Sequence, residues 1–240
     1  MIRLHVTEGI EAGGTVEVTP DQAHYLRGVM RQSPGDRVRV FDGVSGEWEA
    51  EIADLGKRGG VLRIVEQTAP QRNPPDLWLL FAPIKKARTD FIVEKAAEMG
   101  AARICPVQTE FTNSERIRRD RLQAHAVEAA EQCGGTFVPE VAELQRLDRV
   151  LEGWDAGRQI MFCDERLAEE GAALPGTLGD ARMPWAILIG PEGGFSEAER
   201  SRLAALPFAH AVSLGPRILR ADTAAVAAMT LWQTRFGDWC

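Results

Sequence analysis

The chain has 240 residues, of which 26% are charged and 45% hydrophobic, as is ordinary for a soluble globular protein. It has no apolar run near the roughly 20 residues that a membrane span needs, and residues 1–5 lack the pattern of a signal peptide. The net charge of −7 gives no global attraction to nucleic acid, so composition alone slightly favours a small-molecule enzyme.

The first seventy residues have the pattern of a small β-rich module. Turn signals separate short β-like segments, and one helix is expected at about Asp21–Arg31. The β-like segments are 14–18, 37–41, 47–53 and 60–64. Two prolines at positions 74 and 75 then mark a linker, because proline removes backbone donors and extends the preceding residue. We therefore divide the chain into domains at 1–72 and 73–240.

The second part alternates strands with helices, which predicts an α/β domain with a mostly parallel sheet. Leu77–Ala82 is a continuous apolar run, as in a strand covered on both faces. The further strands expected are 104–107, 159–163, 185–189 and 211–214. The helices expected are 88–100, 120–132, one that begins at Ser196, and 223–236.

A glycine-rich loop follows the strand at 185–189. Gly190, Gly193 and Gly194 allow positive φ angles and close approach of a ligand, and Ser196 with Glu199 forms an S-x-x-E capping box for the next helix. The loop lacks the P-loop and dinucleotide-binding spacings. Glu192 inside the turn would repel a pyrophosphate, so a neutral or cationic ligand fits better. A purely structural turn is the alternative.

A second apolar strand also ends in a glycine, Gly215. Arg217, Arg220 and Asp222 follow it before the last helix, which Asp222 or Thr223 can cap. Loops at the carboxyl ends of parallel strands collect function, so we interpret this loop as part of a binding face.

The two loops, IGPEGGFSEAE and LGPRILRADTA, resemble those of the SPOUT class of methyltransferases, in particular the family that methylates uracil N3 in 16S ribosomal RNA. The stretches HYLRGVMRQSPGDRVRVFDG, EKAAEMG and AAEQCGG are similar to the same family, so the resemblance runs through both halves of the chain.

This resemblance implies an N-terminal PUA-like β-barrel and a SPOUT α/β domain with a deep trefoil knot. It also implies a homodimer that binds S-adenosylmethionine and acts on 16S ribosomal RNA or the 30S subunit. The cofactor positions carried over are Leu188, Ile189, Gly190, Glu192, Gly193, Gly194, Leu214, Gly215, Ile218 and Leu219. Two positions depart from the family pattern: Asp222 replaces a common glutamate, and Gly135 replaces a common arginine.

Uracil N3 carries a proton, so a methyltransferase of this kind must take up that proton or stabilise the uracil anion. Arg217 and Arg220 are candidates to stabilise charge or clamp a phosphate, and Glu192 and Asp222 are candidates for the base. The base must also be unpaired or flipped out of the RNA. From the local basic clusters, we choose as RNA-binding candidates Arg27, Arg31, Lys85, Arg88 and Arg116.

The four cysteines form no C-x-x-C pair, and no histidine lies near them at ligand spacing. We therefore expect reduced, mostly buried thiols in a cytoplasmic protein, with no metal site and no membrane partner. Two alternatives stay open: a small-molecule methyltransferase, and an RNA-binding module with the same fold and no catalysis.

Overall fold

A computed structural model describes residues 1–114, 116–170 and 183–239. The chain forms two compact units, one of residues 1–73 with 130–138 and one of residues 74–129 with 139–240. The assignment of 1–72 and 73–240 to separate domains stays a prediction. In the described residues no helix has the length and apolar character that crossing a bilayer requires.

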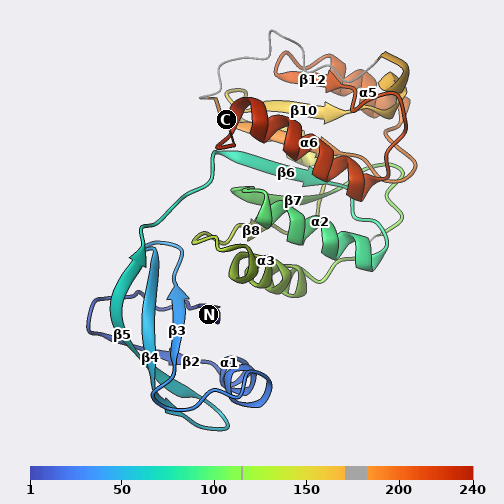
Figure 1. The fold of residues 1–240 in the computed structure, drawn as a ribbon. Coiled ribbons are helices and arrows are strands. Elements are labelled where there is room, and N and C mark those ends of the chain that lie inside the picture. Colours follow the sequence, from blue (N-terminus) through green and yellow to red (C-terminus); the bar gives the residue numbers. More distant parts are fainter. Residues whose placement is uncertain (115, 171–182, 240) are drawn as a thin grey trace. The chain divides into compact units, whose positions relative to one another are not determined.

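The first unit is built on a five-stranded sheet (blue to teal in Figure 1). Its strand order is β1-β3-β4-β5-β2, with β1 parallel to β3 and the other neighbours antiparallel. Alternate side chains such as Val38, Val40 and Ile52 point inward and are fully buried. The strands are β1 (Arg3–His5), β2 (Thr15–Val18), β3 (Arg37–Phe41), β4 (Glu47–Leu55) and β5 (Gly60–Ala69).

The helix of this unit is shorter and less regular than the predicted 21–31. Helix α1 (Pro20–His24) begins with a capping box of Thr19 and Gln22 and then widens into the π-helical turn Tyr25–Val29. Arg31 ends the segment with a φ of 56°, a conformation that is uncommon outside glycine.

The second unit contains a sheet whose neighbouring strands are all parallel. The strand order is β12-β10-β11-β6-β7-β8, and β9 also pairs with β7. The strands are β6 (Leu77–Phe81), β7 (Arg103–Gln108), β8 (Glu140–Val141), β9 (Gln145–Arg146), β10 (Gln159–Cys163), β11 (Trp185–Ile189) and β12 (Ala209–Val212). The β11 residues are all buried, as the continuous apolar runs predict for a sheet covered on both faces.

Helices cover both faces of this sheet. On one face, α4 (Leu147–Glu152) and α5 (Glu197–Ala204) pack their leucines against Leu80, Phe162 and Leu188. On the other, α6 (Ala221–Phe236) contacts β11 and α2 (Lys86–Glu98) (Figure 1). The Phe236 ring stacks on Trp185 with centroids 5.6 Å apart. The remaining helices are α3 (Arg119–Cys133) and the 3₁₀ segment Glu165–Glu170.

Two boundaries near the second glycine loop were predicted wrongly. Strand β12 ends at Val212 instead of residue 214, because the Ser213 hydroxyl accepts a hydrogen bond from the Gly215 amide and turns the chain. Helix α6 begins at Ala221, with Arg220 at the N-cap and no side chain capping it, so neither Asp222 nor Thr223 is the cap. The α/β class is confirmed, whereas the trefoil knot stays a prediction.

Candidate functional site

The two glycine loops meet at the carboxyl ends of β10, β11 and β12, where ligands bind in parallel α/β sheets. They enclose a cavity of about 320 Å³, here called the main cavity. The last residue of β11, ten residues of the two loops and the start of α6 line it; the first two groups are Ile189 and then Gly190, Pro191, Glu192, Gly194, Leu214, Gly215, Arg217, Ile218, Leu219 and Arg220. Of the predicted cofactor residues, all but Leu188 and Gly193 are in this lining.

Leu188 and Gly193 lie elsewhere. Leu188 is fully buried in β11 and packs in the core beneath α4 and α5. Gly193 faces the neighbouring loop, because a Cβ there would lie 3.2 Å from the Cβ of Phe111.

Glycine is required at one point of the main cavity, and a second glycine leaves little room for a side chain. Gly194 has a φ of 69°, and a side chain there would collide with the Glu165 carboxylate. Gly190 lies against the Phe195 ring, where a Cβ would approach to 3.1 Å. Both features keep the backbone of the first loop close to the space a ligand would fill.

The first loop is fixed by the capping box predicted for α5. Ser196 Oγ accepts a hydrogen bond from the Glu199 amide, and Glu199 Oε2 accepts one from the Ser196 amide. The other oxygen of Glu199 accepts a hydrogen bond from the amide of Glu110, in the loop after β7, at 2.8 Å. One carboxylate therefore joins two loops at the carboxyl edge of the sheet.

An ion-pair network forms one wall of the main cavity, and the sequence analysis missed it. Asp164 and Glu165 follow β10 directly, and both line the cavity. The buried Arg200 guanidinium binds Asp164 Oδ1 at 3.0 Å and also binds Glu165 and the Phe195 carbonyl oxygen. Acidic residues directly after a buried strand were the signal available in the sequence. Other lining residues that were missed are Cys163, Ala168, Val212, Ala221 and Ala224.

Arg88 links the two candidate bases. Its guanidinium donates to Glu192 Oε1 at 3.1 Å, and its Nε lies 3.7 Å from Asp222 Oδ2. Glu192 lines the main cavity, whereas Asp222 does not. Arg88, chosen as an RNA-binding candidate, thus lies between two acids of the site.

The second loop presents its polar side chains to solvent. Arg217 and Arg220 are exposed and have no ion-pair partner among the described residues. Between them, Ile218 is 74% exposed although it lines the cavity. The two arginines can bind an anionic group, and the exposed isoleucine can contact a planar apolar one. This part of the cavity lining therefore suits a ligand that carries both kinds of group.

The other RNA-binding candidates are divided between the two units. Arg27 and Arg31 are exposed at the helical segment of the first unit. Lys85 precedes α2 and Arg116 precedes α3, both exposed on loops of the second unit.

The cysteines are free thiols at the three positions described. Cys163 is buried at the floor of the main cavity, and burial raises its pKa to about 12. Cys133 is exposed, so the expectation of mostly buried thiols does not hold for it. In the described ranges no group of His, Cys, Asp and Glu side chains is arranged to hold a metal ion.

Comparisons with known proteins agree with this geometry. A family model described as RNA methyltransferase domain matches residues 71–233, and one described as RNA methyltransferase PUA domain matches residues 18–65. Ribosomal RNA small subunit methyltransferase E of Synechocystis sp. is 33% identical, over 90% of this chain and 71% of that protein. The protein of the same name from Rickettsia conorii is 28% identical, over 95% and 93%.

Two solved structures are similar over nearly the whole chain. Ribosomal RNA small subunit methyltransferase E from Neisseria gonorrhoeae, bound to S-adenosyl methionine, has a TM-score of 0.90 at 27% identity and covers 100% of both chains. A putative methyltransferase from Legionella pneumophila, in complex with the same cofactor, has a TM-score of 0.84 at 27% identity and covers 99% of this chain and 98% of its own.

Proposed function

Since this chain belongs to the RNA methyltransferase family, with a PUA domain before its methyltransferase domain, we propose that it methylates uracil N3 in 16S ribosomal RNA with S-adenosylmethionine as donor. The observation that carries the proposal is the main cavity, which two glycine loops form at the carboxyl edge of a parallel sheet. The small ribosomal subunit as substrate is supported by the printed names of the relatives.

The residues of the main cavity fit S-adenosylmethionine. Backbone approaches the cavity at Gly190 and Gly194, where amides and carbonyls can bond an adenine. Ile189, Leu214 and Leu219 offer apolar contact to the ring, and Glu165 and Glu192 offer carboxylates to hydroxyl and cationic groups. When bound, the cofactor supplies an electrophilic methyl group on a sulfonium.

The chain's own residues would then position the uracil and manage its proton. We assign the base role to Glu192 in preference to Asp222, because Glu192 lines the cavity and Asp222 only flanks Arg88. The carboxylate would take the N3 proton, and the electron pair left on N3 would bond to the methyl carbon as the methyl–sulfur bond breaks and the neutral thioether leaves. Arg88 would keep that carboxylate oriented. Arg217 and Arg220 would stabilise negative charge on the uracil oxygens or hold a phosphate.

The remaining parts of the proposal concern partners. The PUA domain would bind RNA around the target, with Arg27 and Arg31 among its phosphate contacts. We also propose a cytoplasmic homodimer in which the knotted loops form the cofactor site.

The deciding experiment measures S-adenosylmethionine binding by calorimetry for wild type and a Gly194→Ala variant. Because a Cβ at this position collides with Glu165 and the φ is positive, we expect at least a tenfold loss of affinity. The matched control is Gly9→Ala, where a Cβ meets nothing within 4 Å.

A second measurement identifies the product. Unmodified 30S subunits are incubated with enzyme and cofactor, and 3-methyluridine in the 16S ribosomal RNA is quantified by mass spectrometry. Absence of cofactor binding in the wild type would reject the methyltransferase and leave an RNA-binding module. Cofactor binding without RNA binding or 3-methyluridine would support a small-molecule methyltransferase.

A further inference from the structure

A second cavity of about 270 Å³, here called the side cavity, lies beside the main one. It is lined by Pro83, Ile84, Lys85, Lys86, Asn113, Ser114, Pro191 and Glu192. These residues come from the loops after β6, β7 and β11, three neighbouring strands of the sheet, except Lys86, which is the first residue of α2. Pro191 and Glu192 line both cavities, so the two cavities adjoin at the first glycine loop.

The side cavity is suited to an anion. Lys85 and Lys86 are exposed and have no polar partner among the described residues. By contrast, the neighbouring Arg88, Arg118 and Arg121 are each bound to a carboxylate. The one carboxylate in this lining, Glu192, is bound by Arg88, so the two unpaired lysines leave the hollow positively charged and favour a phosphate.

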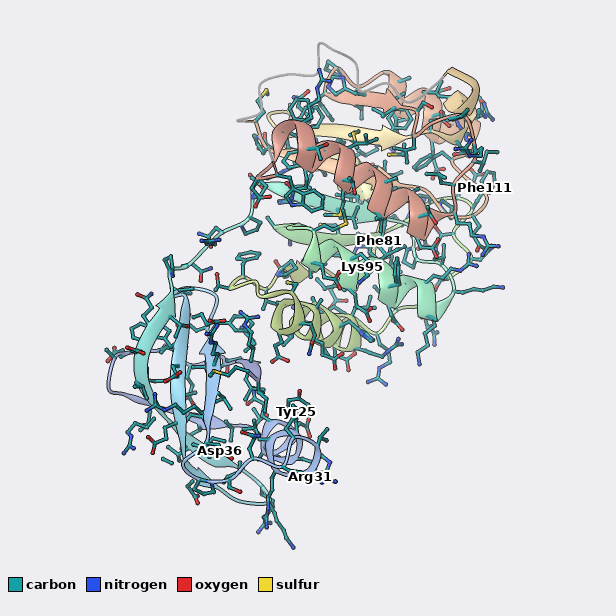
Figure 2. All side chains as sticks on the ribbon, viewed as in Figure 1. Tyr25, Arg31, Asp36, Phe81, Lys95 and Phe111 are labelled. Carbon is teal, nitrogen blue, oxygen red and sulfur yellow. The ribbon has the colours of Figure 1, made fainter. Side chains whose placement is uncertain are left out.

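An exposed aromatic ring stands next to the side cavity. Phe111 is 43% exposed and lies in the loop that also supplies Asn113 and Ser114. Its side chain packs beside Gly193, which follows the cavity residue Glu192. Figure 2 places it at the edge of the second unit towards which β6 and β10 run.

The loop that carries Phe111 is held in place by three polar contacts. The Thr109 amide and hydroxyl both bond the Thr112 hydroxyl at 2.9 Å, and the Glu110 amide bonds Glu199. A braced loop that exposes a phenyl ring is the arrangement with which proteins stack an unpaired base.

We propose that the side cavity receives the uridine nucleotide that is methylated. Lys85 and Lys86 hold its phosphate, Phe111 stacks on the base, and Asn113 and Ser114 offer hydrogen bonds to the uracil oxygens. Of the two roles proposed for Arg217 and Arg220, this leaves the one of holding a phosphate, on a neighbouring nucleotide. The N3 edge then faces Glu192, at the border that the side cavity shares with the main cavity. This assignment rests on the proposed function, because it assumes that the main cavity holds the methyl donor.

The test uses uridine 5′-monophosphate as probe. Saturation-transfer NMR is recorded on the full chain loaded with S-adenosylhomocysteine, for wild type, a Lys85→Ala/Lys86→Ala double variant and Phe111→Ala. We expect saturation of the uracil H5 and H6 protons in the wild type and at least a fivefold weaker signal in both variants. Uridine without phosphate should give a weak signal that the lysine substitutions leave unchanged.

Turnover on unmodified 30S subunits gives the second readout. Both variants should raise KM roughly tenfold, the effect of losing charge-assisted contacts or one base stack. Phe111→Tyr should restore the wild-type value. The control Arg149→Ala removes one exposed charge from α4, which lines neither cavity, and should leave KM unchanged.

Three results would overturn the assignment. The first is no saturation transfer to uridine 5′-monophosphate in the wild type, and the second is saturation transfer of equal strength in the wild type and the variants. The third is displacement of the nucleotide by S-adenosylmethionine, which would show that both bind in one cavity. The variants must bind S-adenosylmethionine as tightly as the wild type, measured by calorimetry. If the wild type does not bind S-adenosylmethionine, the proposed function itself is rejected. Failure of the proposed function can therefore be distinguished from failure of the side-cavity assignment alone.

Discussion

Glu47 is a charged side chain that is only 5% exposed in the first unit. Its two oxygens accept hydrogen bonds from Arg3 at 2.6 Å, from Arg39 at 2.9 Å and from Thr68 at 2.8 Å. Burial by itself would raise the pKa of this carboxyl. The hydrogen bonds of Arg3 and Thr68 and the charges of Arg3 and Arg39 outweigh burial and hold the pKa below its ordinary value.

We therefore predict that Glu47→Gln lowers the free energy of unfolding by about 3 kcal/mol near neutral pH, because it leaves two arginines without their partner. A carboxylate with a lowered pKa adds stability above its unfolded pKa of about 4.3, and this stability is lost as the pH falls. The difference between variant and wild type should thus shrink towards pH 3, as measured by urea unfolding. Glu51→Gln, which removes the exposed Arg63 pair, should cost under about 1 kcal/mol. Equal losses for the two variants would contradict this account.

Cys163 and Cys133 should differ in reactivity. The Cys163 thiol is buried and has its pKa raised to about 12, so it carries almost no thiolate near pH 8, whereas Cys133 is exposed. We predict that iodoacetamide modifies Cys133 readily and leaves Cys163 intact, as read by peptide mass spectrometry. The rate at Cys163 should rise about tenfold per pH unit up to its pKa. Rapid modification near pH 8 would mean that the floor of the main cavity opens to solvent.

At the scale of one element, helix α5 depends on its first turn. Ser196 caps it and Glu199 completes the box, at the exit of the first glycine loop. We predict that Ser196→Ala lowers stability by about 1 kcal/mol and that Ser201→Ala, in the exposed middle of the same helix, does not. Chemical denaturation of the two variants measures this. Alanine has the higher helix propensity, so Ser201→Ala should not destabilise the helix, and a similar loss in both variants would contradict the capping role of Ser196.

The elements that could be predicted are those with strong local signals. Apolar runs gave β6, β10 and β11, and the capping box gave the start of α5. The two- and three-residue strands β1, β8 and β9 are too short to have a period, and their pairing with distant strands forms them. The short helix α4 was missed for a similar reason, since Arg146 at its N-cap gives no capping signal.

The two glycine loops of the site could be predicted from the sequence, whereas its ion pairs could not. Gly190, Gly194 and Gly215 pointed to both loops of the main cavity. Asp164 and Glu165 follow a buried strand, but their pairing with Arg200 could not be read from the sequence, because Arg200 is 36 residues from Asp164 along the chain. Likewise Arg88 meets Glu192 across 104 residues, so only the fold brings these side chains together.

At the scale of the whole molecule, each unit has its own hydrophobic core. A ligand of the main cavity binds the second unit and should stabilise it by about 2.7 kcal/mol at a concentration of 100 times Kd. We predict that S-adenosylmethionine raises the melting temperature of the second unit by roughly 5–10 °C in calorimetry and leaves the transition of the first unit unchanged. A single transition that shifts as a whole would show that the two units unfold together.

The loop between β11 and α5 lines both cavities through Pro191 and Glu192. Mutations in this loop are therefore pleiotropic, since one substitution alters two binding spaces at once. Residues 83–86 and 113–114 line only the side cavity, and residues 214, 215 and 217–219 only the main one. During evolution, the sequences of the loops after β6 and β7 can thus change without altering binding in the main cavity. The shared loop can change only where binding in both cavities is preserved.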